Sequence, residues 1–417
     1  MMLSDDSALS DPSSDLLGYA PFAQSIARGL TDAHALDGLV VALYGRWGAG
    51  KSSLLSFIQH YVREMLNEVQ VLEFNPWWFS GPEDLAENFF AELSRIVSPI
   101  KEAGGAFKTI WSYASPILRI GNSVGKYYLP EKVSALADKA IDVLTPEQLE
   151  RQESFAEAKE KLVKALRGKK SKTLIFIDDI DRLSSQEISQ LFRLIKNVAN
   201  FPNTIYILAF DRDVVATALT GHFGTDGNAY LEKIVQVAFE LPPPEADALT
   251  NMLWARLEKV IEGTPSLLAN VQDLRSMYWS GVNKLIAKPR DVMRLINTLS
   301  ITYSSVKGEV NAADFIALES LRLFCPGLYS LIRENPNMFL GGSAWSPNQV
   351  MVAHEFHSSW KSRQDWNPAV AGVASYLFPQ IASSSDQTTF NWFGMSQAVV
   401  ACGFASQIFY RCTSALA

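Results

Sequence analysis

Short apolar runs and longer amphipathic segments alternate along residues 39–241. Runs rich in apolar and β-branched residues lie at 39–44, 69–75, 173–177, 204–210 and 234–241. Such runs are typical of strands that are buried on both faces of a parallel sheet. Segments with helical character at 53–58, 83–97, 185–198 and 213–220 separate them. The pattern predicts an α/β fold with about five parallel strands joined by right-handed crossovers.

The pattern changes after Pro242-Pro243-Pro244, which interrupts regular structure. Helices are predicted beyond it at 247–261, 273–286, 290–305 and 312–324, and the aromatic-rich remainder is interpreted as helical. The predicted domains are a disordered N-terminus (1–14), an α/β core with a helical insert at about 101–150 (15–244), a helical lid (245–330) and a C-terminal helical region of unknown role (331–417).

The first predicted strand leads into a phosphate-binding loop. Residues 45–52 fit the pattern G-x-x-x-x-G-K-[ST] between a strand and a helix. The glycines allow backbone N–H groups to turn toward phosphates, Lys51 is expected to reach the β- and γ-phosphates, and the Ser52 hydroxyl is expected to ligate Mg²⁺. The residues predicted to bind the nucleotide are Gly45, Arg46, Trp47, Gly48, Ala49, Gly50, Lys51, Ser52 and Ser53.

The run at 173–177 ends in two carboxylates, Asp178 and Asp179, and Ile180-Asp181-Arg182 follows. A carboxylate after a parallel strand faces the crevice where open α/β sheets bind ligands. We expect Asp178 to hold Mg²⁺ and Asp179 to orient and deprotonate the attacking water. Acidic residues in this place also cap helices, and for Asp181 with Arg182 that alternative stays open.

One predicted strand, 69–75, lies between these two motifs, as in the P-loop subgroup that includes AAA-type and signalling ATPases. The chain resembles the KAP family of P-loop NTPases over about residues 15–330, through the motifs at 45–53, 74–77, 177–182 and 288–294. The resemblance implies ATP-driven switching or signalling, because similar bacterial proteins are linked to phage exclusion. It also implies ATP rather than GTP, and no N-K-x-D guanine motif is present.

The resemblance further implies roles for residues outside the two motifs. Tyr19, Ala23 and Ile26 match the place where the family packs the base. Arg290 and Arg294, four apart on one helix face, resemble sensor arginines, and Arg290 is predicted to contact the γ-phosphate; pairing with surface acids is the alternative.

Hydrolysis is also predicted to depend on a second molecule, either another copy of the chain or a partner protein. Lys233 lies where related ATPases offer a positive charge to a neighbour, and Arg212 follows the strand where relatives place a polar sensor. Which of these two cations acts in trans stays open.

Many family members carry transmembrane helices between the two motifs. In this chain the longest apolar run there, Thr109–Leu118, is bounded by Lys108 and Arg119 and falls short of the ~20 residues that a spanning helix needs. The uncharged stretch at 387–410 is interrupted by polar residues. We therefore expect no membrane span, and a cytoplasmic location because no secretory signal is seen.

The composition of the chain limits the kinds of ligand and partner that it is expected to bind. A net charge of −7 argues against non-specific nucleic-acid binding by the whole surface, and three cysteines without a CxxC pair form neither a disulfide framework nor a metal cluster. A basic run at 159–172 could meet nucleic acid or acidic lipid, but Lys and Arg also suit the C-terminal end of a helix, which is the interpretation we favour.

These features predict a protein that binds ATP and Mg²⁺, hydrolyses ATP and acts as a nucleotide-dependent switch in anti-phage defence or signalling. The alternative is a scaffold that binds ATP and hardly turns it over. The presence of Lys51, Ser52, Asp178 and Asp179 favours the enzyme.

Overall fold

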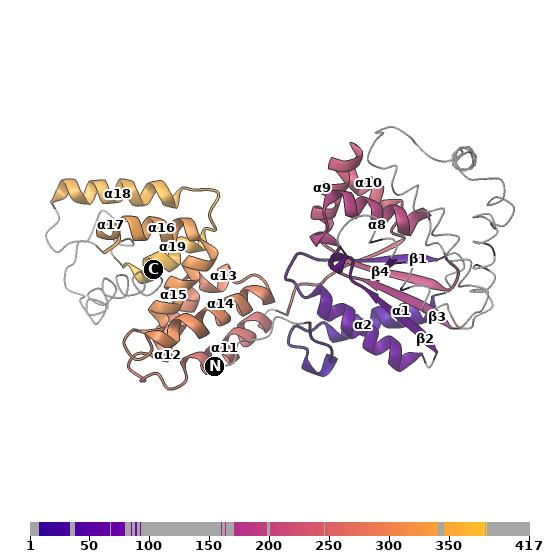
Figure 1. Cartoon of the computed structure of the whole chain (residues 1–417). Coiled ribbons are helices and arrows are strands. Elements are labelled where there is room, and N and C mark those ends of the chain that lie inside the picture. Colours follow the sequence, from indigo (N-terminus) through magenta and orange to yellow (C-terminus); the bar gives the residue numbers. More distant parts are fainter. Residues whose placement is uncertain are drawn as a thin grey trace. The chain divides into compact units, whose positions relative to one another are not determined.

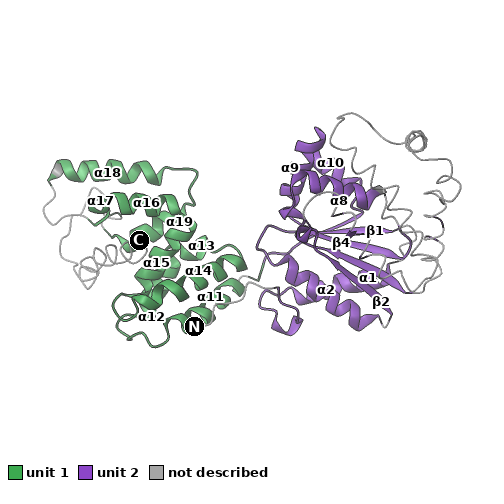
Figure 2. Ribbon diagram, viewed as in Figure 1, with its two compact units in different colours: residues 1–7, 244–417 green, residues 8–243 purple. Residues whose placement is uncertain are grey.

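The computed structural model describes residues 8–33, 38–66, 68–79, 171–197, 201–245, 247–340, 346–379 and 381, with single positions at 85, 88, 89, 92, 160 and 163. The chain divides between Pro243 and Pro244 into two compact units (Figure 2). One is an α/β unit that contains the predicted nucleotide site. The other is a unit whose described elements are all helical.

The α/β unit is built on a five-stranded sheet in which every neighbouring pair is parallel. The spatial order of its strands is β2-β3-β4-β1-β5, so that β4 separates β1 from β3. This confirms the predicted α/β class and the additional strand between the two motifs. The strands are β1 (Leu39–Tyr44), β2 (Val69–Phe74), β3 (Lys172–Ile177), β4 (Thr204–Phe210) and β5 (Val237–Glu240).

Helices lie on both faces of the sheet (Figure 1). One face is covered by α1 (Ala20–Asp32) and α2 (Lys51–Met65). The other is covered by α8 (Ser185–Asn197), α9 (Arg212–Phe223) and α10 (Gly227–Glu232). Short 3₁₀ turns complete the described part of the unit: η1 (Pro12–Ser14), η2 (Pro76–Trp78) and η4 (Ile180–Arg182).

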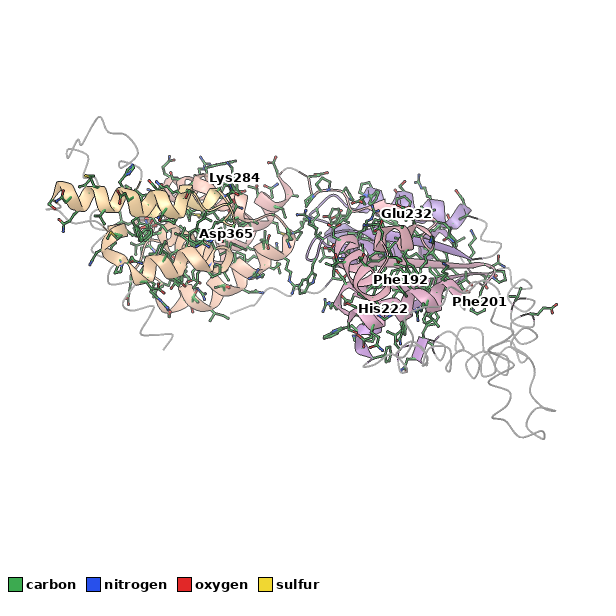
Figure 3. The ribbon with its side chains drawn as sticks, turned by 90° about the horizontal axis from the view of Figure 1, so that it is seen from above. Phe192, Phe201, His222, Glu232, Lys284 and Asp365 are labelled. Atoms are coloured by element: carbon green, nitrogen blue, oxygen red, sulfur yellow. The ribbon has the colours of Figure 1, made fainter. Side chains whose placement is uncertain are left out.

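Burial on both faces explains the nearly continuous apolar runs. Alternate strand residues such as Val40, Ile175 and Leu208 pack into one core with α8 and α9, where Phe192 and Phe201 also lie (Figure 3). The residues between them point to the opposite face and are buried as well, as Val41 shows. Each such side chain contributes about 1.5–3 kcal/mol by leaving water.

The last strand is shorter than the predicted 234–241. Residues 227–232 form α10, and the N–H groups of Ile234 and Val235 both donate to Leu231 O at 2.9 Å. These bonds close the end of the helix, so pairing with β1 begins only at Val237.

The second unit contains nine helices among its described residues. Four of them begin at a proline, whose fixed φ suits the first helical position. The nine helices are α11 (Ala248–Ile261), α12 (Val271–Met277), α13 (Asn283–Leu285), α14 (Pro289–Thr302), α15 (Ala312–Phe324), α16 (Pro326–Glu334), α17 (Pro336–Leu340), α18 (Pro347–Lys361) and α19 (Ala369–Leu377).

The single helix predicted at 273–286 is wrong, because a π-helical turn, η5 (Tyr278–Val282), separates α12 from α13. Gly281 has a φ of 148°, and a Cβ there would lie 2.4 Å from Ala369 O of α19. A Cβ on Gly372 of α19 would lie 2.0 Å from Ser280 O. Backbone of α19 therefore packs directly on backbone of η5, and residues on both sides of position 331 belong to one packed unit.

Several predictions fall outside the described residues: the insert at about 101–150, most of the helix at 83–97, most of the basic run, the first seven residues and the stretch at 387–410. The prediction of disorder over 1–14 is wrong for residues 8–14, which contain η1 and in which Leu9 N–H donates to Ser53 Oγ at 3.1 Å. Within the described part of the chain, no single helix is long and apolar enough to cross a membrane. The pair α15 and α16 meets that criterion together but is bent by 117°.

Candidate nucleotide-binding site

The phosphate-binding loop joins the end of β1 to the start of α2. Gly50 caps α2 with a φ of 104° and without a side-chain hydrogen bond. The first helical hydrogen bond is donated by Leu54 N–H to Gly50 O at 3.1 Å, so the N–H groups of Lys51, Ser52 and Ser53 precede the helical ladder. Unused N–H groups and the helix dipole at this end suit a phosphate.

Gly50 is required here for two reasons. Its positive φ strains any other residue, and a Cβ would lie 3.0 Å from Cε2 of Tyr19. The Tyr19 hydroxyl donates to Ala49 O at 2.9 Å, and burial raises the pKa of Tyr19 to about 12. Tyr19 therefore supports the loop from below as a neutral phenol.

The ammonium of Lys51 points back into the loop. Its Nζ donates to Gly45 O at 2.9 Å, to Arg46 O at 3.5 Å and to Asp181 Oδ2 at 3.4 Å. The Lys51 and Asp181 side chains are only 7% and 8% exposed. Lys51, the residue predicted to bind phosphate, is thus surrounded by acceptors of its own chain. One of them is an acidic partner, Asp181, that was not predicted from the sequence.

Ser52 and Asp178 lie together, as expected for a magnesium site. Burial raises the pKa of the Asp178 carboxyl, and a hydrogen bond from Ser52 acts in the opposite direction. The described residues hold no group of three or more His, Cys, Asp or Glu side chains that could bind a metal by themselves. One hydroxyl and one carboxylate fit Mg²⁺, which usually takes its remaining ligands from water and substrate phosphates. Ser52 and Asp178 would hold it and the ion would neutralise phosphate charge.

Asp179, the candidate base, adopts a left-handed conformation with a φ of 58°. Its Oδ2 accepts from Asn75 Nδ2 at 3.0 Å, and its Oδ1 lies 2.7 Å from Arg182 Nε. Both carboxylate oxygens are therefore engaged. A left-handed non-glycine residue at such a position is a strained feature of the kind that clusters at active sites.

Asn75 and Arg182 were not predicted as site residues. Asn75 follows the last residue of β2, which pairs with β3 so that Phe74 lies opposite Ile177. Its Oδ1 accepts from Trp77 N–H at 3.0 Å, which leaves its amide for Asp179. The signal was a polar residue after the strand beside β3, because the ends of neighbouring parallel strands share one edge of the sheet.

Exposed aromatic side chains lie next to this edge. Trp47 of the loop is 56% exposed, and Trp77 and Trp78 of η2 are 54% and 72% exposed. The Arg182 guanidinium lies over the Trp77 ring, 5.5 Å from its centre. Arg182 thus contacts both the candidate base and a surface tryptophan.

The residues predicted to pack against the nucleobase are buried, two of them in α1 and one just before it. Tyr19, Ala23 and Ile26 are 1%, 0% and 5% exposed. Tyr19 contacts the phosphate-binding loop as described, whereas contact of Ala23 or Ile26 with the nucleobase stays a prediction.

The two candidate cations for action in trans differ in their surroundings. Arg212 donates to Asn228 Oδ1 at 3.1 Å, lies 4.0 Å from Glu232 and covers the Tyr44 ring at 5.6 Å. The side chain of Lys233 is exposed and has no hydrogen bond or ion pair within the described residues. Asp211, which precedes Arg212, caps α9 by accepting from Asp213 N–H at 3.2 Å.

The predicted sensor arginines belong to the helical unit. Arg290 lies in the first turn of α14 and is half-buried, while Arg294 is exposed and its guanidinium lies 5.9 Å from the centre of the Phe324 ring. Contact of either residue with a nucleotide stays a prediction.

Lys172, the last residue of the basic run, has a structural role. Its Nζ donates to the carbonyls of Leu30, Thr31 and Ala33, and so caps the C-terminal end of α1. Burial lowers the pKa of this lysine. Lys172 therefore serves the fold as a residue of β3 that caps another helix, whereas the interpretation of the other basic residues as a solvated helix end stays a prediction, because they lie outside the described residues.

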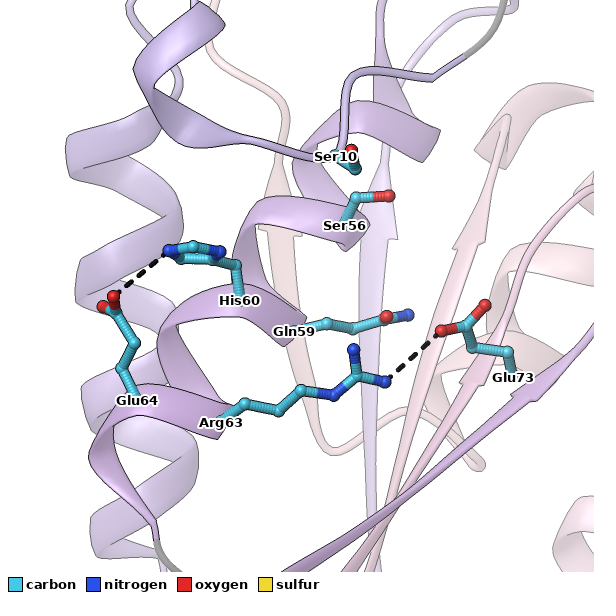
Figure 4. Close-up of a pocket in the computed structure, with 7 residues that line it drawn as sticks. All are labelled: Ser10, Ser56, Gln59, His60, Arg63, Glu64 and Glu73. Atoms are coloured by element: carbon cyan, nitrogen blue, oxygen red, sulfur yellow. Dashed lines mark ion pairs between the residues drawn. The ribbon is translucent and has the colours of Figure 1, made fainter.

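A hollow of about 440 Å³ lies on α2 and β2, away from the loop residues (Figure 4). His60 contacts Glu64 at 3.2 Å, and Arg63 contacts Glu73 at 3.6 Å across it. Arg63 is paired with Glu73, and Glu64 is a second carboxylate there, so the hollow offers no excess of positive charge to a phosphate.

Comparison with known proteins agrees with these motifs. The Phage T7 exclusion protein of Escherichia coli (strain K12) is 26% identical over 413 residues, which cover 88% of this chain and 54% of that protein. The chain thus spans about half the length of this curated relative.

Similar solved structures include the Aeropyrum pernix ORC1 protein in complex with DNA (TM-score 0.37, 13% identity, covering 88% of this chain and 82% of that chain). Domain III of the Thermotoga maritima replication initiation protein DnaA has a TM-score of 0.32 and 14% identity, covering 76% of this chain and 99% of that chain. A Thermotoga maritima RuvB mutant has a TM-score of 0.33 and 13% identity, covering 85% of this chain and 87% of that chain. A family model for the KAP family P-loop domain matches residues 19–306. The chain therefore belongs to the KAP family of P-loop NTPases.

Proposed function

We propose that this chain binds ATP with Mg²⁺, hydrolyses it and uses the cycle as a molecular switch. The observation that carries the proposal is the meeting of Lys51, Ser52 and Asp178 with Asp179 at the carboxyl ends of β1 and β3. The first three groups suit binding of phosphate and metal. Asp179 is the carboxylate that would take a proton from water once its present partners release it.

A role in excluding phage is part of the same proposal. It is supported by the similarity to the Phage T7 exclusion protein, of which this chain matches 54%. Signalling is the other setting that family membership supports, and in both settings ATP turnover would time a change of state.

A scaffold that binds ATP without turnover is the second candidate. The observation that favours it is the engagement of both Asp179 oxygens by Asn75 and Arg182. A base held in this way has to be released before it can act.

Two measurements on the full chain separate the candidates. Calorimetry with ATP, with and without Mg²⁺, tests binding, and a steady-state phosphate-release assay tests turnover. We expect Mg²⁺-dependent binding and measurable release of phosphate. Binding without release would favour the scaffold, and no binding would overturn both candidates.

A further inference from the structure

The turn η4 lies between two charged groups of the candidate site. Asp181 Oδ2 is 3.4 Å from Lys51 Nζ, and Arg182 Nε is 2.7 Å from Asp179 Oδ1. Asp181 and Arg182 are adjacent in the chain. One turn of three residues therefore contacts both the phosphate-binding lysine and the candidate base.

Lys51 has no spare donor in this arrangement. An ammonium has three N–H donors, and Gly45 O, Arg46 O and Asp181 Oδ2 accept them. Incoming phosphates have to displace at least one of these acceptors. Asp181 is the only charged one of the three, so it competes most directly with phosphate for Lys51.

Displacement leaves Asp181 in an unfavourable position. Its side chain is 8% exposed, so water solvates it poorly. Once Lys51 is bound to phosphate, this carboxylate lies near negative oxygens without its cation, and like charges in such surroundings repel strongly. Movement of the turn relieves the repulsion.

Such movement reaches Asp179 through short connections. Arg182 N–H donates to Asp179 O at 3.1 Å, while Ile180 is fully buried and fixes one end of the turn. The Arg182 guanidinium also lies over the Trp77 ring. A shift of Asp181 therefore changes the position of Arg182 relative to both the Asp179 carboxylate and a surface tryptophan.

We propose that η4 senses whether the nucleotide site is occupied. In the empty site Asp181 takes the place of phosphate on Lys51, and Arg182 holds Asp179. When phosphate binds Lys51, Asp181 is displaced and Arg182 loosens its hold, so the base becomes available only when nucleotide is present. This inference rests on the proposed nucleotide-binding function.

The first test is the affinity of Asp181→Asn for a non-hydrolysable ATP analogue with Mg²⁺, measured by calorimetry. The variant leaves Lys51 without a counter-charge in the empty site, so we expect the dissociation constant to fall roughly three- to tenfold. Asp211→Asn is the matched control, because it removes one charge after a neighbouring strand while asparagine still caps α9. Its affinity should stay close to that of the wild type.

Unchanged or weaker binding by Asp181→Asn would overturn the proposal; weaker binding would indicate that Asp181 helps to hold Mg²⁺. Failure of the wild type to bind would instead overturn the proposed function.

The second test follows the turn itself in the wild type. The fluorescence of Trp77 is obtained by subtracting the signal of Trp77→Phe, which removes the contribution of Trp47 and the other tryptophans. We expect the analogue to change the Trp77 signal, and we expect a smaller change in Asp181→Asn because its turn is already released. Saturation with the analogue without any Trp77-dependent change would refute the coupling, even if Asp181→Asn failed to fold.

Discussion

Buried polar groups serve different purposes in the two units. In the helical unit two buried carboxylates are held by groups of the fold itself: Asp291 Oδ2 accepts from the N–H groups of Ala287 and Lys288, and Glu319 pairs with Arg322. In the α/β unit Lys51, Asp178 and Asp179 meet at one edge of the sheet, where a ligand can replace their present partners. Burial of charge alone therefore does not mark a functional site; the exchangeability of its partners does.

The first prediction is that the catalytic groups of one α/β unit are incomplete and that a second molecule supplies a cation. An isolated unit that contained all of the catalytic groups would contradict it most strongly. A cation supplied in trans is worth about 10³–10⁵ in rate for P-loop enzymes. We expect the rate per protomer to rise with protein concentration, and Lys233→Ala to lower the rate at high concentration toward that of the dilute protein. A flat rate from nanomolar to micromolar protein, with monomers seen by mass photometry in ATP, would refute this expectation.

Arg212→Ala is the control for that measurement, because Arg212 is held within its own chain by Asn228 and Glu232. Loss of the concentration dependence in Arg212→Ala but not in Lys233→Ala would reverse the assignment. Arg290→Ala is expected to reduce turnover more than it weakens ATP binding, which would extend the site to the helical unit.

The second prediction compares the partly buried carboxylate of Asp179 with the buried carboxylate of Glu319. Asp179→Asn keeps the shape but removes the base, so turnover should fall by about 10²-fold while ATP still binds. Glu319→Gln, the matching change in the helical unit, weakens the contact with Arg322 and should lower stability without affecting the rate per folded molecule. Equal losses of turnover in single-turnover assays would contradict the distinction between the units.

The third prediction compares two lysines of the α/β unit. Lys51→Ala removes the cation from the phosphates, so the dissociation constant for ATP should rise about tenfold or more, or roughly 1.4 kcal/mol. Lys172→Met removes the cap of α1 and should lower the free energy of unfolding by about 1 kcal/mol with little effect on ATP binding. Calorimetry and denaturant unfolding measure the two effects.

The smallest expected effect is a pH dependence of the helical unit. Trp360 Nε1 donates to His357 Nδ1 at 2.9 Å, so the neutral ring carries its proton on Nε2, facing Met338 O at 3.0 Å. Burial lowers the pKa of His357, as do the nearby Lys361 and His354, whereas the Met338 carbonyl raises it. The unfolded chain therefore binds a proton at a higher pH than the folded chain does.

Stability from His357 is accordingly complete above the ordinary histidine pKa of 6.5 and declines as the pH falls below it. We expect α18 to exchange amide hydrogens faster at pH 5.5 than at pH 7.5, after correction for intrinsic rates, by no more than about 1.4 kcal/mol in opening free energy. His357→Gln should flatten this dependence, whereas His222→Gln in the α/β unit should not.

The sheet could be predicted from sequence because its strands are buried on both faces, and the observed β1 and β4 have the predicted bounds. The break at Gly281 could not, because it depends on the approach of α19, almost ninety residues later in the chain. In the same way, the loop motif indicated Lys51, but only the folded chain shows that Asp181 pairs with it. Local patterns predicted elements and motifs, and contacts between distant segments decided the rest.

The interlocking of Gly281 and Gly372 has a consequence for where this protein can be divided. The family match ends at residue 306, inside the helical unit, whereas α19 lies at 369–377. Trimming the gene at the family border would remove the backbone against which η5 is shaped and leave buried surface open to water. A cut between Pro243 and Pro244 instead follows the division between the compact units. The segment that matches the family model and the compact units of the structure therefore have different boundaries in this chain.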